Sequence, residues 1–575
     1  MQIAKVVPKA NTKSSNVFDY AIPPEILPQT QIGVLVKIPF HGREIEGIII
    51  DLKKTSNILK LKSILEIIDP VPVVNQLHIE LAKWMTEYYL APLGKTLFEN
   101  IVPPAIRAIK KNEETQIPKH AILRSNKNIL IVGNFTQRLK LYKEAIRKTI
   151  AGGRAAIIIV PDLSLIDPII HEFKNYTLLH SEMTKTKRWE AWNNIRNSKI
   201  QLVIGSTSAL FAPLPNLGLV IVDQEEDETY KNDRSPRFHA RDVALALGRL
   251  GHINVILGSI TPKTETYELA QNNKLVLKEF KTAESEIKIV DMSRERSILS
   301  EPLTKEIEKV LQKDGRILLF YDRKGSRPRF ACAQCDWISS ENTPVTNCPE
   351  CKGIKIKPIG FSTKKLIALI KSRWPDQNAI LVEKESEFNL ASKWNFAIST
   401  SFGLKFVWPE IDLVGIIDAD MDSNLPDFSS RERNFQKLFK FLSITTRGII
   451  QTHQAESRFI SALSSLDYKV FFTNEIAERK KYHYPPFTKL IKLITQNQDR
   501  SLAQKEIEEI FENLKSYTDT DTEILEPQEL YQKIGAPMHR FQILVKTNAK
   551  GNSELKSRIK NLENIIIDVD PISTT

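Results

Sequence analysis

The four cysteines of the chain lie within twenty residues and have the spacing of a metal site. Cys332 and Cys335 form one Cys-x2-Cys pair, and after twelve residues Cys348 and Cys351 form a second. Two such pairs can surround one tetrahedral Zn²⁺ with four thiolates at about 2.3 Å. The alternatives are four unrelated thiols or a redox-active pair, and the clustering favours zinc. Because four thiolates leave no open coordination position, we expect one structural Zn²⁺ without a catalytic role.

The composition indicates a basic protein with several domains. The chain has 575 residues, of which 42% are hydrophobic and 26% charged, enough for about three or four domains. Lys and Arg number 81 against 69 Asp and Glu, a formal net charge of +12, so a polyanionic partner is expected, nucleic acid first and an anionic membrane second. No apolar run approaches the ~18 residues of a membrane-spanning helix, and the start has no signal-peptide core. We therefore expect a cytosolic protein with no membrane partner.

Glycine is scarce, at 21 of 575 residues, which is about half the usual ~7%. Loops that hold phosphates use glycine because their backbone N–H groups must approach the ligand closely. The shortage is a first, indirect sign that such a loop has been altered.

The pattern of apolar runs divides the chain into four kinds of structure. Near the start, runs at 34–40 and 45–51 flank His41-Gly42-Arg43, a hairpin signal, and a helix is predicted over 77–89. Two series of short apolar runs then alternate with helical segments, as in parallel sheets covered by helices. The first series is 129–132, 156–160, 201–204, 218–223 and 254–257, and the second is 316–320, 379–382, 396–399, 412–418 and 448–451. Strands at 490–494, 541–545 and 565–569 predict a small α+β domain at the end.

Several motifs occur in one order along nearly the whole chain. They are Val17-Phe-Asp-Tyr20, Trp84-Met-Thr-Glu-Tyr-Tyr-Leu-Ala-Pro-Leu-Gly94, the stretch from Gly205-Ser-Thr-Ser-Ala-Leu-Phe211 to Arg237-Phe-His-Ala-Arg-Asp242, Leu257-Gly-Ser-Ile-Thr-Pro262, Tyr484-Pro-Pro-Phe487 and Ile567-Asp-Val-Asp-Pro571. With these motifs the chain resembles the PriA family of replication-restart DNA helicases. The resemblance implies a multidomain α/β fold: two RecA-like helicase lobes with an inserted zinc-binding region, an N-terminal β-rich DNA-binding domain and a small C-terminal α+β domain.

The resemblance and the apolar pattern together give the expected domain boundaries. An N-terminal 3′-end DNA-binding domain covers 1–105, and 106–128 is a linker that stands where family members have a winged-helix module. Lobe 1 covers 129–285, lobe 2 covers 286–452 with the zinc-binding insertion at 330–355, and the C-terminal domain covers 453–575. The family's second, inner set of four cysteines is absent, which again predicts one zinc ion.

The nucleotide-binding motifs of lobe 1 depart from the family pattern. The family's glycine-rich phosphate loop ends in Gly-Lys-Thr, and here the matching stretch runs from Gly133 through Arg138, with one glycine and no lysine. Arg is a poor substitute for a lysine that must fit among phosphates. The family's Asp-Glu-Glu-His motif becomes Asp223-Gln224-Glu225-Glu226. Gln224 cannot accept a proton, so the general base is lost even if Mg²⁺ still binds Asp223. Glu225 is the alternative base, but strand alternation points it away.

Lobe 2 shows the same kind of change. The family's Lys-Gly-His-Asp-Phe-Pro segment appears as Lys405-Phe-Val-Trp-Pro409, and its Gly-Arg-Ala-Gly-Arg motif appears as Ser443-Ile-Thr-Thr-Arg447. Arg447 is the one remaining arginine of a motif that supplies arginine fingers, groups that contribute orders of magnitude to phosphoryl-transfer rates. The sequence therefore predicts no catalytic residues for ATP hydrolysis. It leaves open whether ATP and Mg²⁺ still bind through Gly133, Arg138 and Asp223.

The N-terminal motif concerns DNA ends. In the family, the aspartate of Phe-Asp-Tyr faces the sugar at a 3′ end, and here these residues are Phe18, Asp19 and Tyr20. A carboxylate can accept a hydrogen bond from a 3′-hydroxyl and repels a phosphate, which selects an end without reading sequence. From the residues alone, Phe18 and Tyr20 are core residues and Asp19 a turn residue; the resemblance favours the DNA role.

The sequence thus predicts a replication-restart primosome protein that binds stalled or branched forks with a 3′ end. Its expected partners are forked DNA, single-strand-binding protein and the proteins that load the replicative helicase, and its expected location is the cytoplasm, with the nucleoid. We expect no helicase activity. The alternative is an active ATP-dependent 3′-to-5′ helicase with divergent motifs, and a scaffold with no DNA role is a third possibility.

Overall fold

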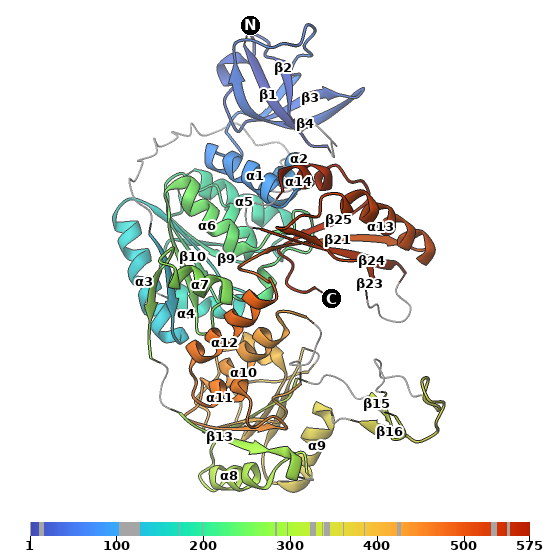
Figure 1. Cartoon of the computed structure of the whole chain (residues 1–575). Coiled ribbons are helices and arrows are strands. Elements are labelled where there is room, and N and C mark those ends of the chain that lie inside the picture. Colours follow the sequence, from blue (N-terminus) through green and yellow to red (C-terminus); the bar gives the residue numbers. More distant parts are fainter. Residues whose placement is uncertain are drawn as a thin grey trace. The chain divides into compact units, whose positions relative to one another are not determined.

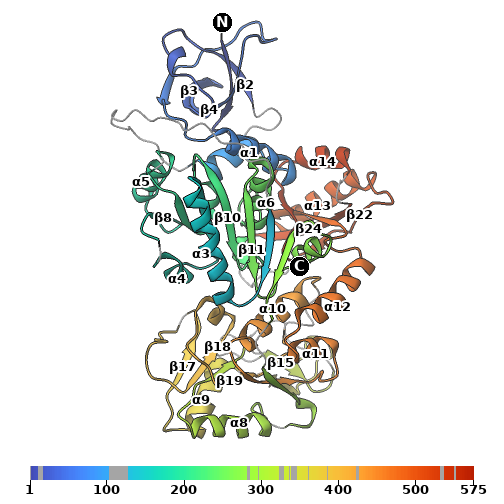
Figure 2. The same cartoon turned by 90° about the vertical axis from the view of Figure 1, so that its left-hand side faces the viewer.

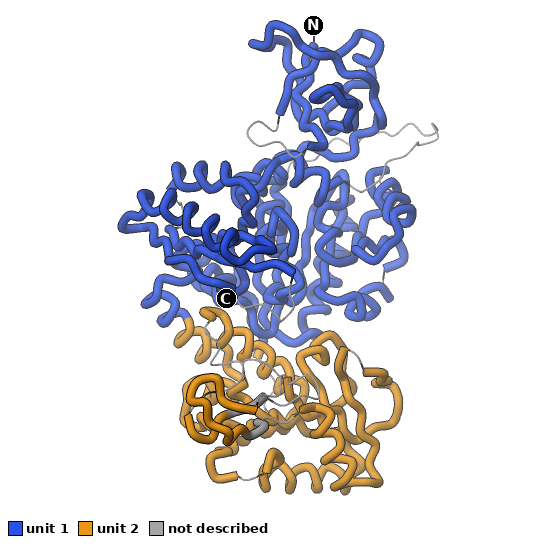
Figure 3. The backbone as a smooth tube through the Cα atoms, turned by 90° about the vertical axis from the view of Figure 1, so that its right-hand side faces the viewer, with its two compact units in different colours: residues 1–280, 476–575 blue, residues 281–475 orange. Residues whose placement is uncertain are grey.

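The computed structural model of the chain divides into two compact units (Figures 1 and 3). Unit 1 comprises residues 1–280 and 476–575, and unit 2 comprises residues 281–475. The structure describes residues 2–10, 17–102, 127–171, 173–197, 199–281, 285–295, 297–322, 329–335, 337, 346–359, 362–384, 386–421, 427–530, 537–548 and 552–574. The expected linker therefore lies outside the described residues except for positions 127 and 128. No helix of the described part has both the length and the apolar character needed to cross a membrane.

Unit 1 begins with a five-stranded antiparallel sheet in the order β2-β1-β4-β3-β5. Its strands are β1 (Ile3–Pro8), β2 (Phe18–Ala21), β3 (Leu35–Phe40), β4 (Arg43–Lys53) and β5 (Glu66–Asp69). The predicted hairpin is present between β3 and β4, where His41 and Gly42 have φ of 46° and 77°; a two-residue turn of this kind needs positive φ at both positions. The predicted helix is α1 (Gln76–Tyr88), followed by α2 (Leu93–Thr96) and a single turn at Leu97–Ile101.

The centre of unit 1 is a seven-stranded parallel sheet in the order β12-β6-β11-β10-β7-β9-β8. Its strands are β6 (Asn128–Val132), β7 (Ala155–Ile159), β8 (Tyr176–Leu179), β9 (Leu202–Gly205), β10 (Leu217–Asp223), β11 (Asn254–Ser259) and β12 (Val276–Glu279). Helix α3 (Phe135–Ala151) lies on one face of the sheet (Figure 2). Its Tyr142 and Ile146 pack into the core cluster on that face. Gly248 of α6 (Ala240–Gly251) contacts Val255 of β11 on the opposite face. Helices therefore cover both faces, as the sequence predicted.

Three shorter helices complete this lobe: α4 (Asp167–Ile170), α5 (Lys185–Arg196) and α7 (Thr264–Gln271). The C-terminal part of unit 1 is an antiparallel sheet in the order β22-β24-β21-β25, with β23 also paired to β24. Its elements are β21 (Lys489–Asn497), α13 (Arg500–Lys515), β22 (Thr522–Ile524), β23 (Gln528–Glu529), β24 (His539–Thr547), α14 (Ser553–Lys560) and β25 (Ile566–Val569). This is the predicted small α+β domain. Helix α12 (Tyr468–Lys481) begins in unit 2 and ends in unit 1.

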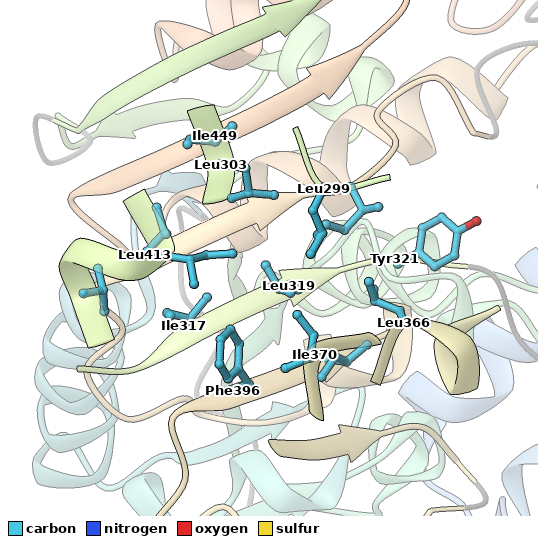
Figure 4. Packing of buried hydrophobic residues seen from close by; sticks show 14 of the residues in the cluster. Leu299, Leu303, Ile317, Leu319, Tyr321, Leu366, Ile370, Phe396, Leu413 and Ile449 are labelled. Carbon is cyan, nitrogen blue, oxygen red and sulfur yellow. The ribbon is translucent and has the colours of Figure 1, made fainter. Parts of the chain in front are cut away.

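Unit 2 is built on a second parallel sheet, in the order β13-β20-β19-β14-β18-β17. Its strands are β13 (Glu286–Asp291), β14 (Ile317–Phe320), β17 (Ala379–Val382), β18 (Phe396–Ser399), β19 (Leu413–Ile416) and β20 (Arg447–Thr452). Helices α8 (Glu301–Leu311) and α9 (Thr363–Arg373) bury Leu303 and Leu366 against one face (Figure 4). On the other face the ring of Phe320 packs on Phe441 of α10 (Ser430–Leu442), with 4.6 Å between ring centroids. The short helix α11 (Arg458–Ser464) follows β20.

The fold class expected from the sequence is confirmed: two parallel α/β lobes, a β-rich N-terminal domain, a cysteine cluster and a small C-terminal α+β domain. Every strand predicted from an apolar run is present. The apolar pattern missed ten strands: β1, β2, β5, β8, β12, β13, β22, β23 and the two-stranded pair β15 (Arg329–Cys332) and β16 (Ile356–Ile359). All of these except β1 pair on one side only among the described strands. The domain boundaries remain a prediction.

Candidate functional site

Asp223 lies at the carboxyl end of β10, fully buried, on the edge where open parallel sheets bind their ligands. Arg138 from α3 binds it twice: Nε donates to Oδ1 at 2.7 Å, and Nη2 donates to Oδ2 at 3.3 Å. The hydroxyl of Tyr142, one turn further along α3, donates to the same Oδ1 at 2.7 Å. The Arg138 side chain is 4% exposed and that of Asp223 0%. Both carboxylate oxygens are therefore taken by donors from the protein itself.

The loop before α3 is closed by its own side chains. Nη1 of Arg138 donates to the carbonyl of Gly133 at 2.7 Å. Asn134 caps the helix: its Oδ1 accepts from the Gln137 N–H at 3.0 Å, while Gln137 Oε1 accepts from the Asn134 N–H at 2.9 Å. A phosphate at a helix N-terminus binds such backbone N–H groups, and this capping box already occupies two of them. A Cβ added at Gly133 would lie within 2.9 Å of Gln137 and Phe280, so the loop has little free space.

The Tyr142 hydroxyl lies directly against Gly258 of β11. A Cβ at position 258 would be 1.6 Å from the hydroxyl oxygen, so only glycine fits beside this tyrosine. Burial raises the pKa of Tyr142 and the charge of Asp223 adds to the shift, which keeps the hydroxyl protonated as a donor. Burial alone would lower the pKa of Arg138, but the charge of Asp223 outweighs it and the pKa rises. Arg138, Asp223 and Tyr142 form one buried hydrogen-bonded group, called the Asp223 network below.

The two residues after Asp223 have separate places. Gln224 begins the turn with φ of 49°, and its carbonyl accepts from the Asp227 N–H at 2.9 Å. Glu225 is fully buried and bonds the start of α7: its carboxylate accepts from the Lys263 N–H at 2.8 Å and from the Thr266 hydroxyl at 2.9 Å. Burial raises the pKa of Glu225 to about 7, although Arg241 opposes the shift. The Glu225 carboxylate is thus engaged in holding α7.

Arg447 is the first residue of β20, paired in register with Glu286 at the start of β13. All strands of this sheet are parallel, so Arg447 lies at its amino-end edge and not at the carboxyl-end edge where ligands of such sheets bind. Its backbone N–H donates to the Thr445 hydroxyl at 3.2 Å.

Asp19 lies in β2, and its carboxylate is held by the end of β4 and the segment after it. Lys53 and Ser56 both donate to Oδ2, Ser56 at 2.6 Å. Burial would raise the pKa of Asp19, but the hydrogen bonds from Lys53 and Ser56 and the Lys53 charge outweigh it, so the pKa is lowered. The flanking residues point to the other side of the strand: Tyr20 is buried and donates to the Pro39 carbonyl at 3.1 Å, and Phe18 packs on the same core.

The four cysteines meet at the hairpin of β15 (Arg329–Cys332) and β16 (Ile356–Ile359). Their Sγ atoms lie within 4.8 Å of one another, and the pairs Cys332–Cys351 and Cys335–Cys348 are each 3.5 Å apart. These separations suit the ~3.8 Å edge of a tetrahedron with Zn–S bonds of about 2.3 Å. The cluster could hold a metal ion.

The described residues thus form two parallel α/β lobes, a separate β-rich N-terminal domain, a small C-terminal α+β domain and the buried Asp223 network. Residues 6–102 match the family model of the PriA 3′ DNA-binding domain, and residues 480–572 match that of the primosomal protein N C-terminal domain. Both matched segments are thus similar to domains of PriA proteins.

Curated relatives match over almost the whole chain. The replication restart protein PriA of Rickettsia conorii is 27% identical, covering 96% of this chain and 97% of the relative. PriA of Borreliella burgdorferi is 26% identical, covering 94% and 93%, and PriA of Rickettsia typhi is 28% identical, covering 99% of both.

The sequence interpretation brought together Gly133, Arg138 and Asp223, and the structure places them in one network. The sequence interpretation did not predict the roles of Tyr142, Lys53 and Ser56, because each hydrogen-bonds a residue far away in sequence. The one available signal for Tyr142 was its position, four residues after Arg138 on the same face of a predicted helix.

Proposed function

We propose that this chain is a replication-restart protein that binds branched DNA with a 3′ end and recruits the machinery that loads the replicative helicase, without hydrolysing ATP. The observation that carries this proposal is the Asp223 network. The network bears on whether Asp223 can hold the Mg²⁺ needed for ATP hydrolysis. A helicase requires that hydrolysis, whereas a protein that only binds forks does not.

ATP hydrolysis in this fold needs a metal held at Asp223 and a base beside it. Arg138 already neutralises the Asp223 charge in a dry site, and Tyr142 uses a further lone pair of the same carboxylate. Mg²⁺ would have to displace the guanidinium and leave it buried without its partner, and breaking a buried pair in this way costs about 3–5 kcal/mol. Even a displaced network would lack a base, because Gln224 has no carboxylate.

Binding of a 3′ end is supported by the arrangement at Asp19. Lys53 and Ser56 both donate to Oδ2, which fixes the carboxylate. No described residue donates a hydrogen bond to Oδ1, so this oxygen is our candidate acceptor for a sugar hydroxyl. The lowered pKa of Asp19 keeps the group charged at neutral pH, so that it accepts from a hydroxyl and repels a terminal phosphate. The +12 net charge supplies the sequence-independent attraction to phosphates.

The cysteine cluster would hold one structural Zn²⁺ through Cys332, Cys335, Cys348 and Cys351. Thiolate ligands and a closed shell of four suit a metal that organises the hairpin. With the C-terminal domain, this region is our candidate for contacts with single-strand-binding protein and helicase-loader proteins, in the cytoplasm and at the nucleoid.

The first experiment measures DNA-stimulated ATP hydrolysis by the purified full chain on a forked substrate. The matched control is the variant Gln224→Ala. We expect no turnover above this control. Turnover in the wild type that the substitution abolishes would overturn the proposal and make the chain an active helicase.

The second experiment measures binding to forks whose nascent strand ends in a 3′-hydroxyl or a 3′-phosphate. We expect the wild type to prefer the hydroxyl by about tenfold, the size of one charge-assisted hydrogen bond, and Asp19→Asn to lose most of that preference. Asp51→Asn is the control, because Asp51 lies in β4 of the same sheet with a side chain that is 52% exposed. Equal binding of the two ends by the wild type contradicts end recognition.

A further inference from the structure

Within unit 1, a lysine of lobe 1 holds the end of β25 in the C-terminal domain. Lys231 lies in the loop between β10 and α6, and its side chain is 5% exposed. Its Nζ lies 2.8 Å from Asp568 Oδ1 and donates to the carbonyls of Val569 at 2.7 Å and Asp570 at 2.9 Å. An ammonium group has three N–H donors. Three acceptors from consecutive residues of the C-terminal domain therefore match its full capacity.

Helix α1 contacts the same part of the C-terminal domain. The hydroxyl of Tyr88, the last residue of α1, donates to Asp570 Oδ2 at 2.8 Å. Lys489, the first residue of β21, donates to the Tyr88 carbonyl at 3.4 Å, and its Nζ lies 3.4 Å from the centre of the Tyr88 ring. A cation in this position is attracted by the electrons of the ring. One residue of α1 thus contacts the C-terminal domain through its hydroxyl, its ring and its backbone.

The loop that carries Lys231 also holds α1. Tyr89, the residue after α1, is 2% exposed, and its hydroxyl accepts from the His239 N–H at 3.2 Å. Lys231 and His239 belong to one loop and pair with each other in a β-bridge. The contacts therefore connect α1, the C-terminal domain and the 231–239 loop pairwise, and together they are called the clamp below.

The charged groups of the clamp depend on one another, because burial removes them from water. Burial raises the pKa of Asp570, and the charges of Lys489 and Lys231 oppose the shift. Burial likewise lowers the pKa of Lys489, and the charge of Asp570 opposes that shift. Removing one member of such a group leaves its partners buried with less compensation, which is strongly destabilising. A break at one contact should therefore weaken the others.

We propose that the clamp couples α1 to the C-terminal domain, so that loosening either one loosens the other. Helix α1 lies within residues 6–102, and the clamp residues of the C-terminal domain lie within residues 480–572, the two segments that match family models. The coupling is a property of the free protein and needs neither a DNA end nor a partner protein. Its test is therefore independent of the proposed function.

The test measures hydrogen exchange of the full chain on both sides of the clamp. The reporter in α1 is the Tyr89 N–H, which donates to the Met85 carbonyl at 2.9 Å. The reporter in the C-terminal domain is the Asp570 N–H, which donates to the Leu490 carbonyl at 2.9 Å. Neither hydrogen bond joins α1 to the C-terminal domain, so each amide reports the opening of its own segment.

Two substitutions break the clamp at different contacts. Tyr88→Phe removes the hydroxyl and keeps the ring, and Lys231→Met removes the ammonium and keeps most of the side-chain length. The matched controls are Tyr482→Phe, at a residue that is 55% exposed, and Lys505→Met, at a side chain that is 73% exposed. Both control residues belong to unit 1. Tyr88→Phe is the milder change and decides the test alone if Lys231→Met does not fold.

We expect Tyr88→Phe to speed exchange of the Asp570 amide about tenfold, the effect of one lost hydrogen bond to a charged group. Lys231→Met should speed exchange of both reporter amides by at least about tenfold, although the acceptors of Lys231 lie in the C-terminal domain. The two controls should stay within about twofold. The double variant should exchange more slowly than the product of the two single effects, because both contacts act through Asp570.

Three results would overturn the coupling. The first is a Tyr89 amide that exchanges in Lys231→Met at the Lys505→Met rate. The second is an Asp570 amide that exchanges in Tyr88→Phe at the Tyr482→Phe rate. The third is a double variant whose exchange equals the product of the single effects, since independent contacts behave in that way.

Discussion

Removing the carboxylate of Asp223 has opposite consequences for stability in a metal-binding lobe and in this one. Where an aspartate waits for Mg²⁺, its charge is uncompensated in the free protein, and its removal is neutral or stabilising. Here the carboxylate accepts three hydrogen bonds, two from Arg138 and one from Tyr142. We therefore predict that Asp223→Ala strongly destabilises the free protein.

The magnitude follows from burial. The side chains of Arg138 and Asp223 are 4% and 0% exposed. Among the described residues, the substitution therefore leaves the buried guanidinium with the Gly133 carbonyl as its hydrogen-bond partner. Breaking a buried ion pair from one side costs about 3–5 kcal/mol. Replacing both members with apolar residues avoids the stranded charge and is often close to neutral. Arg138→Leu combined with Asp223→Ala should therefore recover most of the loss, with a coupling energy of about 2 kcal/mol or more.

The assay is native-state hydrogen exchange of the amides in α3 and β10, because a chain of several domains does not unfold in one step. Lys140→Ala is the control on the exposed side of α3, where we expect a change within about 0.5 kcal/mol. Protection in Asp223→Ala that equals or exceeds the wild type would refute the reasoning, as would a double variant no more stable than the single one.

Three further predictions concern Gly258, Glu225 and the cysteine cluster. Gly258→Ala sets a Cβ 1.6 Å from the Tyr142 hydroxyl and should lower the free energy of local opening by about 1–3 kcal/mol. Gly152→Ala, whose Cβ meets nothing closer than 3.4 Å, should not, and hydrogen exchange of the α3 and β11 amides compares the two variants. The pKa of Glu225 is raised to about 7 in the folded state, so this group's contribution to stability is fully present below the unfolded pKa near 4.5 and is lost as pH rises through 7, by up to about 3 kcal/mol. Glu225→Gln should flatten that fall in the opening free energies of the α7 amides, measured by hydrogen exchange between pH 4.5 and 7.5. Cys348→Ser should reduce the zinc bound per chain, measured by elemental analysis, from one ion to a small fraction, and undiminished zinc would place the metal elsewhere.

Local signals in the sequence were enough for much of the fold. The His41-Gly42 pair between two alternating runs predicts a tight hairpin, and the structure has it, with both residues at positive φ. The cysteine spacing likewise predicted a cluster, and the four Sγ atoms do converge. In each case the residues that meet are near neighbours in sequence, so spacing alone carries the information.

The parts that the sequence did not predict depend on distant contacts or on exposure. Strand β12, with the sequence Val-Leu-Lys-Glu, is mostly exposed at a sheet edge and has no apolar pattern to detect. Tyr142 reaches Asp223 across 81 positions of sequence, and Ser56 reaches Asp19 across 37. The altered motifs predicted that the phosphate loop before α3 had changed. Only the folded chain shows that Arg138 and Tyr142 hydrogen-bond Asp223 there.

The hydrogen bonds from Arg138 and Tyr142 to Asp223 have a physical reason. A carboxylate that is fully buried at the end of β10 needs a cation or several donors, because an isolated charge in the interior is very costly. In a nucleotide-binding lobe the metal provides that compensation only while nucleotide is bound. Here Arg138 and Tyr142 provide it within the protein, so the Asp223 carboxylate has its partners with no ligand present. We therefore expect nucleotide and Mg²⁺ to have little effect on the conformation around Asp223, since a ligand shifts an equilibrium only by its differential affinity.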